Sequence, residues 1–251
     1  MKTIILAAGI GQRLGNHSEN RPKCLLEFNG KSLLQRHLEI LHYYGMDDIV
    51  IVTGFEADMI KSALSKIGEN DAELCFNPDF TKGSILSMLV GLETLGSEQK
   101  FILMDADVLY DHNIIARLIN SDNENVFLLD QDFEPGEEPV KLCVHNNQLI
   151  EFRKKIDENL AFELQGESVG FFKFTSQTAK QLNLKASEYI SKGEDDAPYE
   201  EVIRDLLLEE PDQYSFEDIT GLSWLEIDFP EDVIKARESI LPKLTAMPQK
   251  H

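Results

Sequence analysis

A glycine-containing loop near the N-terminus follows a short apolar run and is accompanied by two cations. Residues 6–14 read LAAGIGQRL, and RPK follows at residues 21–23. Glycine lets backbone N–H groups approach a polyphosphate without side-chain interference. Arg13 offers a fork of donors to phosphate oxygens, and Lys23, held by the rigid Pro22, is a point charge suited to a phosphorus atom under attack. These residue types in this spacing predict a nucleoside triphosphate site.

Two better-known phosphate loops do not fit this stretch. A Walker loop requires GxxxxGK[ST], which the chain lacks. The dinucleotide fingerprint GxGxxG fails because Gly11 is followed by Arg13 and Leu14. A GxG after a strand is by itself a common tight turn, so the prediction rests on the whole combination of LAAGxGxRL with RPK.

Two carboxylates in other segments are candidates for a divalent cation. Transfer to an α-phosphorus needs charge neutralisation and in-line placement, usually with Mg²⁺ on the phosphate oxygens. Asp107, in MDADVL, and Asp228, in EIDFP, are the predicted magnesium ligands. Asp105 is expected either to support the metal ligands without binding the ion itself, or to bind the ribose. Glu226 is expected to face away, because residues two apart share a face only where a strand stays regular.

Apolar runs alternate with amphipathic segments through the first half of the chain. The predicted strands are 2–8, 48–53, 73–76 and 101–104, and the predicted helices are 32–44, 57–67 and 84–95. This alternation is typical of a parallel sheet with helices on both faces. Ligands of such sheets bind at the carboxyl ends of the strands, so Gly9, Gly54 and the Asp105/Asp107 pair should share one rim.

The second half predicts a mixed-sheet extension that forms an acceptor pocket. Strands are expected at 126–130, 141–144, 149–152, 169–174 and 225–228, and helices at 179–192, 198–209 and 231–241. One domain over residues 1–251 is predicted. It comprises a nucleotide-binding half (1–120), an acceptor-binding extension (121–225) and a closing segment with the second metal aspartate (226–241).

Composition limits the classes of partner. The chain has 251 residues and a formal net charge of −21, which argues against nucleic acid or an anionic membrane as a partner. No apolar run approaches the roughly 18 residues of a membrane span. The three cysteines form neither a disulfide framework nor a zinc pattern, which is typical of a reducing cytoplasm. A cytoplasmic protein is expected, and a homodimer is left open.

These motifs resemble the nucleotidyltransferase superfamily that activates sugar phosphates and alcohol phosphates. The resemblance rests on LAAGIGQRL, RPKCLLEFNGKSLLQRHLEIL, DADVLYD and WLEIDFPEDVIKA, and covers nearly the whole chain. It implies a Rossmann-like three-layer α/β/α fold with a mixed central sheet, catalytic phosphate contacts from Arg13 and Lys23, and Mg²⁺ on Asp107 and Asp228. The implied nucleotide-binding residues are Leu6, Ala7, Ala8, Gly9, Gly11, Arg13, Lys23, Gly83, Ser84 and Asp105.

Within that superfamily the chain is most similar to phosphocholine and 2-aminoethylphosphonate cytidylyltransferases. Four stretches carry this: NGKSLLQRHLEIL, DADVLYD, GESVGFFKF and TGLSWLEIDFPEDVIKA. The resemblance implies transfer of CMP from CTP to a small phosphorylated alcohol or phosphonate, with release of pyrophosphate. The sequence departs from the usual pattern at residues 82–85, where KGSI replaces an asparagine-containing base loop.

Three alternatives remain at this point. A sugar-1-phosphate could be the acceptor, with UTP, dTTP or GTP as donor, although EFRK at 151–154 lacks the proline of the sugar-activating Glu-Lys-Pro element. Asp105-Ala106-Asp107 also satisfies the DxD pattern of a glycosyltransferase, but such an enzyme has no triphosphate to bind. A non-catalytic nucleotide sensor would not need the paired carboxylates or Lys23.

The acceptor is expected to meet both cations and anions. Lys141 and Lys154 are candidates for its phosphate or phosphonate, because Lys141 lies in an apolar strand where an unpaired ammonium would be costly. A cationic head group would be met by carboxylates and aromatic faces. The candidates for it are Glu167, Tyr199, Glu200 and Trp224.

Overall fold

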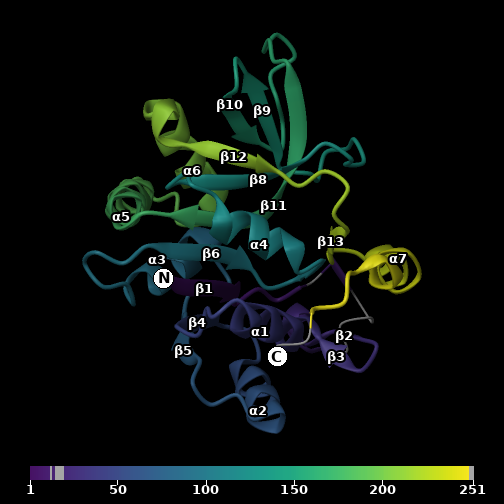
Figure 1. Cartoon of the computed structure of the whole chain (residues 1–251). Coiled ribbons are helices and arrows are strands. Elements are labelled where there is room, and N and C mark those ends of the chain that lie inside the picture. The colour runs from purple at the N-terminus through teal and green to yellow at the C-terminus, as the bar shows by residue number, and fades with distance from the viewer. Residues whose placement is uncertain (12, 15–19, 249–251) are drawn as a thin grey trace.

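The computed structural model describes residues 1–11, 13–14 and 20–248, and its centre is a nine-stranded mixed sheet (Figure 1). Four neighbouring strands are parallel: β6 (Phe101–Asp105), β1 (Lys2–Ala7), β4 (Ile49–Thr53) and β5 (Glu73–Phe76). Nearly every residue of β1, β4 and β6 is buried, because helices cover both faces of the sheet. The predicted strands of the first half are therefore confirmed.

The other half of the sheet is largely antiparallel and is organised by one long strand. It contains β8 (Val126–Asp130), β9 (Lys141–His145), β10 (Gln148–Arg153), β11 (Leu164–Phe174) and β12 (Ser215–Asp218). The long strand β11 pairs with β6, β8 and β9, and so joins the two halves. It begins five residues before the predicted 169. The short strand β12 was not predicted, because its sequence SFED has no apolar alternation.

Helices cover both faces and make three layers. One face packs against α1 (Leu33–Tyr43), α2 (Ala57–Ile67) and α4 (Asn113–Asn120), and the other against α3 (Ser84–Leu92), α5 (Ser176–Ser191) and α6 (Tyr199–Glu209). Adjacent side chains of β1 point to opposite faces of the sheet. Ile5 packs in the core beneath α1, α2 and α4, and Ile4 packs in the core beneath α3, α5 and α6. Helix α4 was not predicted, because it is only eight residues long.

The closing segment brings a distant part of the chain to the carboxyl end of the sheet. Strand β13 (Trp224–Glu226) pairs antiparallel with β7 (Val108–Tyr110). The amide of Ile227 then donates to the carbonyl of Asp107 at 2.9 Å, which places Asp228 beside Asp107. The helix predicted over 231–241 is confirmed as a helical segment, but it is not a regular α-helix throughout. The segment consists of α7 (Pro230–Lys235), a π-helical turn (Ala236–Ile240) and a 3₁₀ turn (Leu241–Lys243), because the spacing of its backbone hydrogen bonds changes twice.

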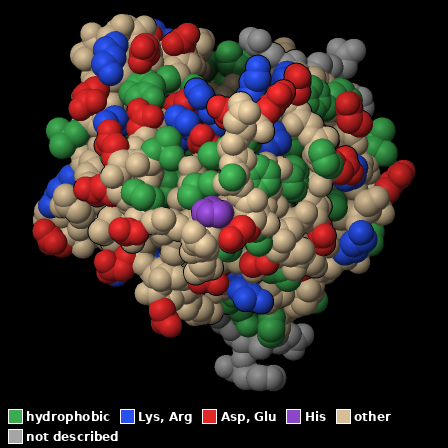
Figure 2. All heavy atoms as spheres, turned by 90° about the horizontal axis from the view of Figure 1, so that it is seen from above, with side chains coloured by type: hydrophobic (Ala, Val, Ile, Leu, Met, Phe, Trp, Pro, Cys, Tyr) green, Lys and Arg blue, Asp and Glu red, His purple; other side chains and the backbone are tan. Residues whose placement is uncertain are grey.

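The surface carries acidic and basic side chains side by side. On the face shown in Figure 2, aspartate and glutamate are scattered, with lysine and arginine between them. Among the described residues, no helix is both long and apolar enough to cross a membrane. All three cysteines are free thiols.

Candidate active site

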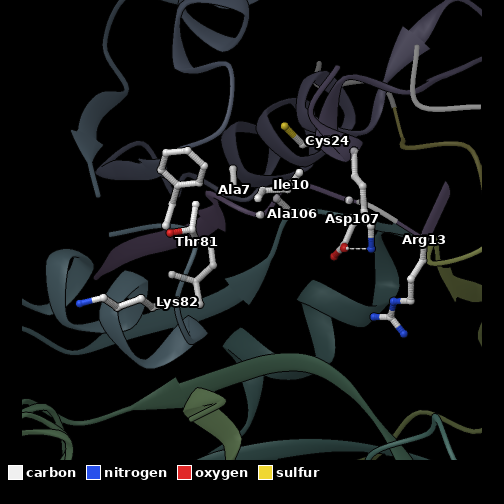
Figure 3. A pocket seen from close by; sticks show the side chains of 13 residues that line it. Ala7, Ile10, Arg13, Cys24, Thr81, Lys82, Ala106 and Asp107 are labelled. Atoms are coloured by element: carbon white, nitrogen blue, oxygen red, sulfur yellow. Dashed lines mark hydrogen bonds and ion pairs between the residues drawn. The ribbon is translucent and has the colours of Figure 1, made fainter. Parts of the chain in front are cut away.

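A cavity of about 440 Å³ opens at the carboxyl ends of β1 and β6. The glycine loop lines one side, and the loop between β5 and α3 lines another. Figure 3 shows Thr81 and Lys82 on one side of this cavity, with Asp107 and Arg13 across from them. The lining comprises Leu6, Ala7, Gly9, Ile10, Gly11, Arg13, Lys23, Cys24, Phe80, Thr81, Lys82, Ala106 and Asp107. Most of the residues predicted to bind the triphosphate therefore surround one cavity; Gln12 of the motif lies outside the described residues.

The ammonium group of Lys23 lies between the two predicted metal ligands. Its Nζ is 2.9 Å from Oδ2 of Asp107 and 2.5 Å from Oδ1 of Asp228. Burial lowers the pKa of Lys23, but the charges and hydrogen bonds of the two aspartates outweigh burial and hold the pKa above its ordinary value. Lys23 thus brings a cation to the wall of the cavity.

Arg13 lies further out, where two carboxylates hold its guanidinium. Nη2 is 3.0 Å from Oδ2 of Asp228, and Nη1 is 3.0 Å from Oε2 of Glu138. The guanidinium also lies over the ring of Phe229, 5.2 Å from its centroid. About half of the side chain is exposed, so phosphate oxygens can reach it from the cavity.

Three carboxylates converge beside Lys23. One ligand oxygen each from Asp107, Glu226 and Asp228 lies within 4.8 Å of the others. The expectation that Glu226 faces away is wrong, because the amide of Ile227 continues the pairing of β13 by donating to the carbonyl of Asp107, and Glu226 and Asp228 on either side of it both reach the cluster. Carboxylate oxygens are the ligands that Mg²⁺ prefers, so the donor set fits a magnesium ion with water completing its shell.

Two residues from the second half of the chain, Tyr199 and Gly170, pack against the carboxylate of Asp105. The hydroxyl of Tyr199 donates to Oδ2 of Asp105 at 2.7 Å. Gly170, at a φ of +77°, leaves room for this carboxylate, because a Cβ there would lie 2.2 Å from the same oxygen. Burial and the neighbouring charge of Asp107 raise the pKa of Asp105 well above its usual range. A contact to the ribose remains a prediction for it.

The predicted base loop is divided between the cavity and the start of α6. The hydroxyl of Ser84 accepts from the amide of Tyr199 at 2.9 Å. A Cβ on Gly83 would lie 2.2 Å from the carbonyl oxygen of Ala197, so Gly83 packs against that segment. The cavity is lined instead by Phe80, Thr81 and Lys82. The loop that contains these three was predicted to read the base, but Gly83 and Ser84 were the residues selected from it as binding residues.

A second cavity, of about 430 Å³, adjoins the carboxylate cluster on the side of β8 and β11. Glu226 and Asp228 line it together with Asp130, Glu167 and Trp224. The indole Nε1 of Trp224 donates to Oδ2 of Asp130 at 2.7 Å. Two of the predicted acceptor-binding residues, Glu167 and Trp224, therefore share a cavity with the second metal aspartate.

The two lysines predicted for the acceptor phosphate have other partners. Nζ of Lys141 donates to the carbonyls of Gly136, Pro139 and Lys154, at 2.8, 3.2 and 2.6 Å. Three carbonyls satisfy all three ammonium donors, so Lys141 holds the 136–141 turn and lines neither cavity. Nζ of Lys154 lies 3.1 Å from Oε2 of Glu138, and the same oxygen also forms the ion pair with Arg13.

The remaining two acceptor candidates lie at the start of α6. Tyr199 is almost fully buried, and its hydroxyl is engaged by Asp105. Oε2 of Glu200 is buried without a hydrogen-bond partner in the described structure. Burial raises the pKa of Glu200, while Lys154 acts in the opposite direction. A direct contact of either residue with an acceptor stays a prediction.

Comparison with known proteins identifies a family profile and several similar proteins. The profile of the MobA-like NTP transferase domain matches residues 3–163. The CTP:phosphoglutamine cytidylyltransferase of Campylobacter jejuni is 27% identical over 93% of this chain and 98% of its own length. The choline-phosphate cytidylyltransferase of Streptococcus pneumoniae is 39% identical over 80 residues, 32% of this chain and 34% of its own length.

A solved structure shows the same fold. The CTP:phosphocholine cytidylyltransferase from Streptococcus pneumoniae superposes with a TM-score of 0.72 at 22% identity, covering 94% of this chain and 97% of that one. This confirms the predicted three-layer α/β fold with a mixed sheet.

Proposed function

The chain belongs to the family of MobA-like NTP transferase domains, and we propose that it transfers CMP from CTP to a small phosphorylated alcohol or phosphonate, releasing pyrophosphate. The proposed acceptor is of the phosphocholine or 2-aminoethylphosphonate type. The observation that carries the proposal is the position of Lys23, whose ammonium meets Asp107 and Asp228 beside a glycine loop that lines a cavity. The similarity to two cytidylyltransferases supports CTP as the donor.

The proposed reaction needs no protein nucleophile. An oxyanion of the acceptor's own phosphate or phosphonate attacks the α-phosphorus, one new P–O bond forms, and the bond to the β-phosphate oxygen breaks. Pyrophosphate leaves with that electron pair. Catalysis then consists of positioning and of stabilising negative charge.

Two side chains of this chain are placed for that task. Lys23 supplies a cation that its neighbours keep protonated, and it stabilises the charge that develops at the α-phosphate. Arg13 offers several N–H donors to the β- and γ-phosphates. These phosphates would compete with the carboxylates of Glu138 and Asp228 for the guanidinium. Asp107, Glu226 and Asp228 would hold a magnesium ion, which supplies further positive charge to the phosphate oxygens.

The alternatives are less well supported. A DxD glycosyltransferase consumes a nucleotide-sugar and would have no use for the proposed triphosphate site, whereas the family to which this chain belongs is one of NTP transferases. A sugar-1-phosphate acceptor keeps the same chemistry and differs only in the acceptor pocket. We place the reaction in the reducing cytoplasm, where the three free thiols would persist.

A pyrophosphate-release screen tests the proposal. It crosses CTP, UTP, dTTP and GTP with phosphocholine, 2-aminoethylphosphonate and sugar-1-phosphates in the presence of Mg²⁺. We expect release with CTP and the first two acceptors, together with a cytidylylated product by mass spectrometry. Release with sugar-1-phosphates alone would overturn the acceptor class, and turnover of a nucleotide-sugar without pyrophosphate would overturn the mechanism.

A further inference from the structure

One carboxylate oxygen holds two cations that were both predicted to bind phosphate. Oε2 of Glu138 lies 3.0 Å from Nη1 of Arg13 and 3.1 Å from Nζ of Lys154. Arg13 comes from the loop after β1, whereas Lys154 directly follows β10. Glu138 therefore places an anionic oxygen where the two cations meet, as an oxygen of a bound phosphate would.

Glu138 resembles a bound phosphate in charge as well as in position. The hydrogen bond and charge of Lys154, and next the charge of Arg13, hold the pKa of Glu138 below its ordinary value, so the carboxylate is ionised near neutral pH. Its side chain is 55% exposed, and ion pairs so open to water are weak. A phosphate carries more negative charge and can bind a guanidinium through two oxygens, so it competes favourably for the same cations.

Glu138 belongs to the surface segment 131–140, which connects β8 to β9 and contains no helix or strand. A second ion pair holds this segment, since Oε1 of Glu134 lies 2.8 Å from Nζ of Lys235. Both glutamates are more exposed than buried. Near β9, Lys141 holds the turn through backbone carbonyls. Surface ion pairs that other charges can replace thus hold the outer part of the segment.

The segment 131–140 also forms a wall of the second cavity. The residues of the segment that line this cavity are Asp132, Phe133, Glu134, Pro135, Glu138 and Pro139. Arg13 lines the first cavity and not the second. The pair of Arg13 with Glu138 therefore links the phosphate side of the first cavity to a wall of the second.

We propose that Glu138 is an internal competitor for substrate phosphate. In the empty site its carboxylate holds Arg13 and Lys154, and the phosphates of the nucleotide displace it together with the segment 131–140. Phosphates bound to Arg13 leave Glu138 with one cation in place of two and place negative charge beside it, which repels the carboxylate. The inference rests on the proposed function, because that function brings the phosphates to Arg13. It adds a residue that weakens nucleotide binding and couples it to the opening of the second cavity.

The direction of the effect on affinity distinguishes a competitor from a structural tie. A residue that only positions Arg13 for the nucleotide strengthens binding, so its loss weakens binding. A competitor reduces the fraction of the protein that is ready to bind, so its loss strengthens binding.

Glu138→Gln tests this direction, because the amide keeps the size of the side chain and removes its charge. Calorimetric titration with CTP and with pyrophosphate, at one Mg²⁺ concentration and without acceptor, measures Kd in the absence of turnover. We expect both Kd values to fall about two- to ten-fold, the range for the loss of competing exposed ion pairs.

Glu137→Gln is the matched control. Glu137 is the exposed neighbour of Glu138 and lines neither cavity, and its replacement removes the same charge from the chain. The Kd values of this variant should equal those of the unaltered protein.

Trp224, the only tryptophan of the chain, reports on the second cavity that it lines. Saturation of the unaltered protein with pyrophosphate should shift the emission of Trp224 to longer wavelength, because the displaced segment admits water to the cavity. The emission of free Glu138→Gln should already be shifted in the same direction. The measurement on the unaltered protein decides the question even if the variant does not fold, as shown by its melting temperature.

The outcomes separate the two proposals. Unchanged or weaker binding by Glu138→Gln would overturn the competitor and leave nucleotidyl transfer intact. An unchanged emission of Trp224 at saturating pyrophosphate would overturn the displacement of the segment. A lack of binding of both CTP and pyrophosphate by the unaltered protein would overturn the proposed function itself.

Discussion

Gly11 lies directly against the side chain of Lys23: a Cβ on Gly11 would be 2.9 Å from Cγ of Lys23. Gly11 also has a φ of +66°, a conformation that disfavours other residues. Gly11 therefore matters for more than the exposure of its backbone amide. It leaves the space through which the lysine stem reaches Asp107 and Asp228.

Gly11→Ala should consequently impair catalysis by moving Lys23. We expect kcat to fall about ten-fold or more, because an ångström-scale displacement of a catalytic group has effects of this size. Steady-state pyrophosphate release measures it. Gly45→Ala is the control, since Gly45 has a φ of +72° but no atom within 4 Å of its Cβ position. Equal effects of the two variants would show that backbone strain alone is responsible.

Lys23→Ala should lower kcat far more than it raises KM for CTP. The ammonium stabilises charge that develops at the α-phosphorus, and loss of one such group costs about 100- to 1,000-fold in kcat. Lys31→Ala removes a surface lysine that pairs with Glu39, and should leave kcat unchanged. Near-normal turnover of Lys23→Ala would exclude Lys23 from the mechanism.

Asp228→Asn should weaken the response to magnesium. Asp228 contributes to the three-carboxylate cluster and also holds Arg13 and Lys23. The Mg²⁺ concentration for half-maximal activity should rise at least about ten-fold, as happens when metal-site groups are altered. Asp107→Asn should raise this Mg²⁺ concentration to a similar extent. Asp122→Asn changes an exposed aspartate and should leave it unchanged. A magnesium response like that of the unaltered protein would argue against this ion site.

Gly170→Ala should destabilise the fold and displace Asp105. The left-handed φ of +77° costs about 1–2 kcal/mol with a side chain. The overlap of the new Cβ with Oδ2 of Asp105 adds to this cost. Gly193→Ala provides the comparison, because Gly193 has a φ of +81° and open space around it. Urea unfolding should show a larger loss for Gly170→Ala, and an equal loss would mean that Asp105 can move freely.

His37 should make stability depend on pH on the acidic side. Its ring is fully buried, with Nε2 3.0 Å from the carbonyl of Ala106 and Nδ1 3.2 Å from the hydroxyl of Tyr110. Burial lowers the pKa of His37 to about 4, below its unfolded value of about 6.5. The unfolded chain therefore binds the extra proton between these values, and stability falls as pH decreases through that range.

The size of this effect can be measured against a variant without the titrating ring. Between pH 7.5 and pH 5 the lost contribution should be about 2 kcal/mol, from a shift worth 1.36 kcal/mol per unit. Urea unfolding of the unaltered protein and of His37→Gln at both pH values gives the difference. Equal pH dependence of the two proteins would show that folding does not lower the pKa of His37.

Local patterns predicted the order of the elements and the residues of the proposed phosphate and metal sites. Apolar runs such as 48–53 identify buried strands, because the period of apolar residues depends only on the conformation of the neighbouring chain. Gly11, Lys23, Asp107 and Asp228 were identified in the same way, because their spacing around strand ends reflects the chemistry of phosphate and magnesium. Short elements, such as the eight-residue α4 and the four-residue β12, were missed.

Packing over long sequence distances decided the rest. Glu226 joins the carboxylates because β13 pairs with β7, and the amide of Ile227 then donates to the carbonyl of Asp107. Asp130 and Glu167 meet through the register of β8 with β11, and Trp224 reaches Asp130 from 94 positions away in the chain. No local pattern encodes such pairings, because a shift of one residue in strand register would turn these side chains to the opposite face. The sequence alone thus predicted the triphosphate site, whereas the tertiary structure assembled the carboxylate cavity beside it.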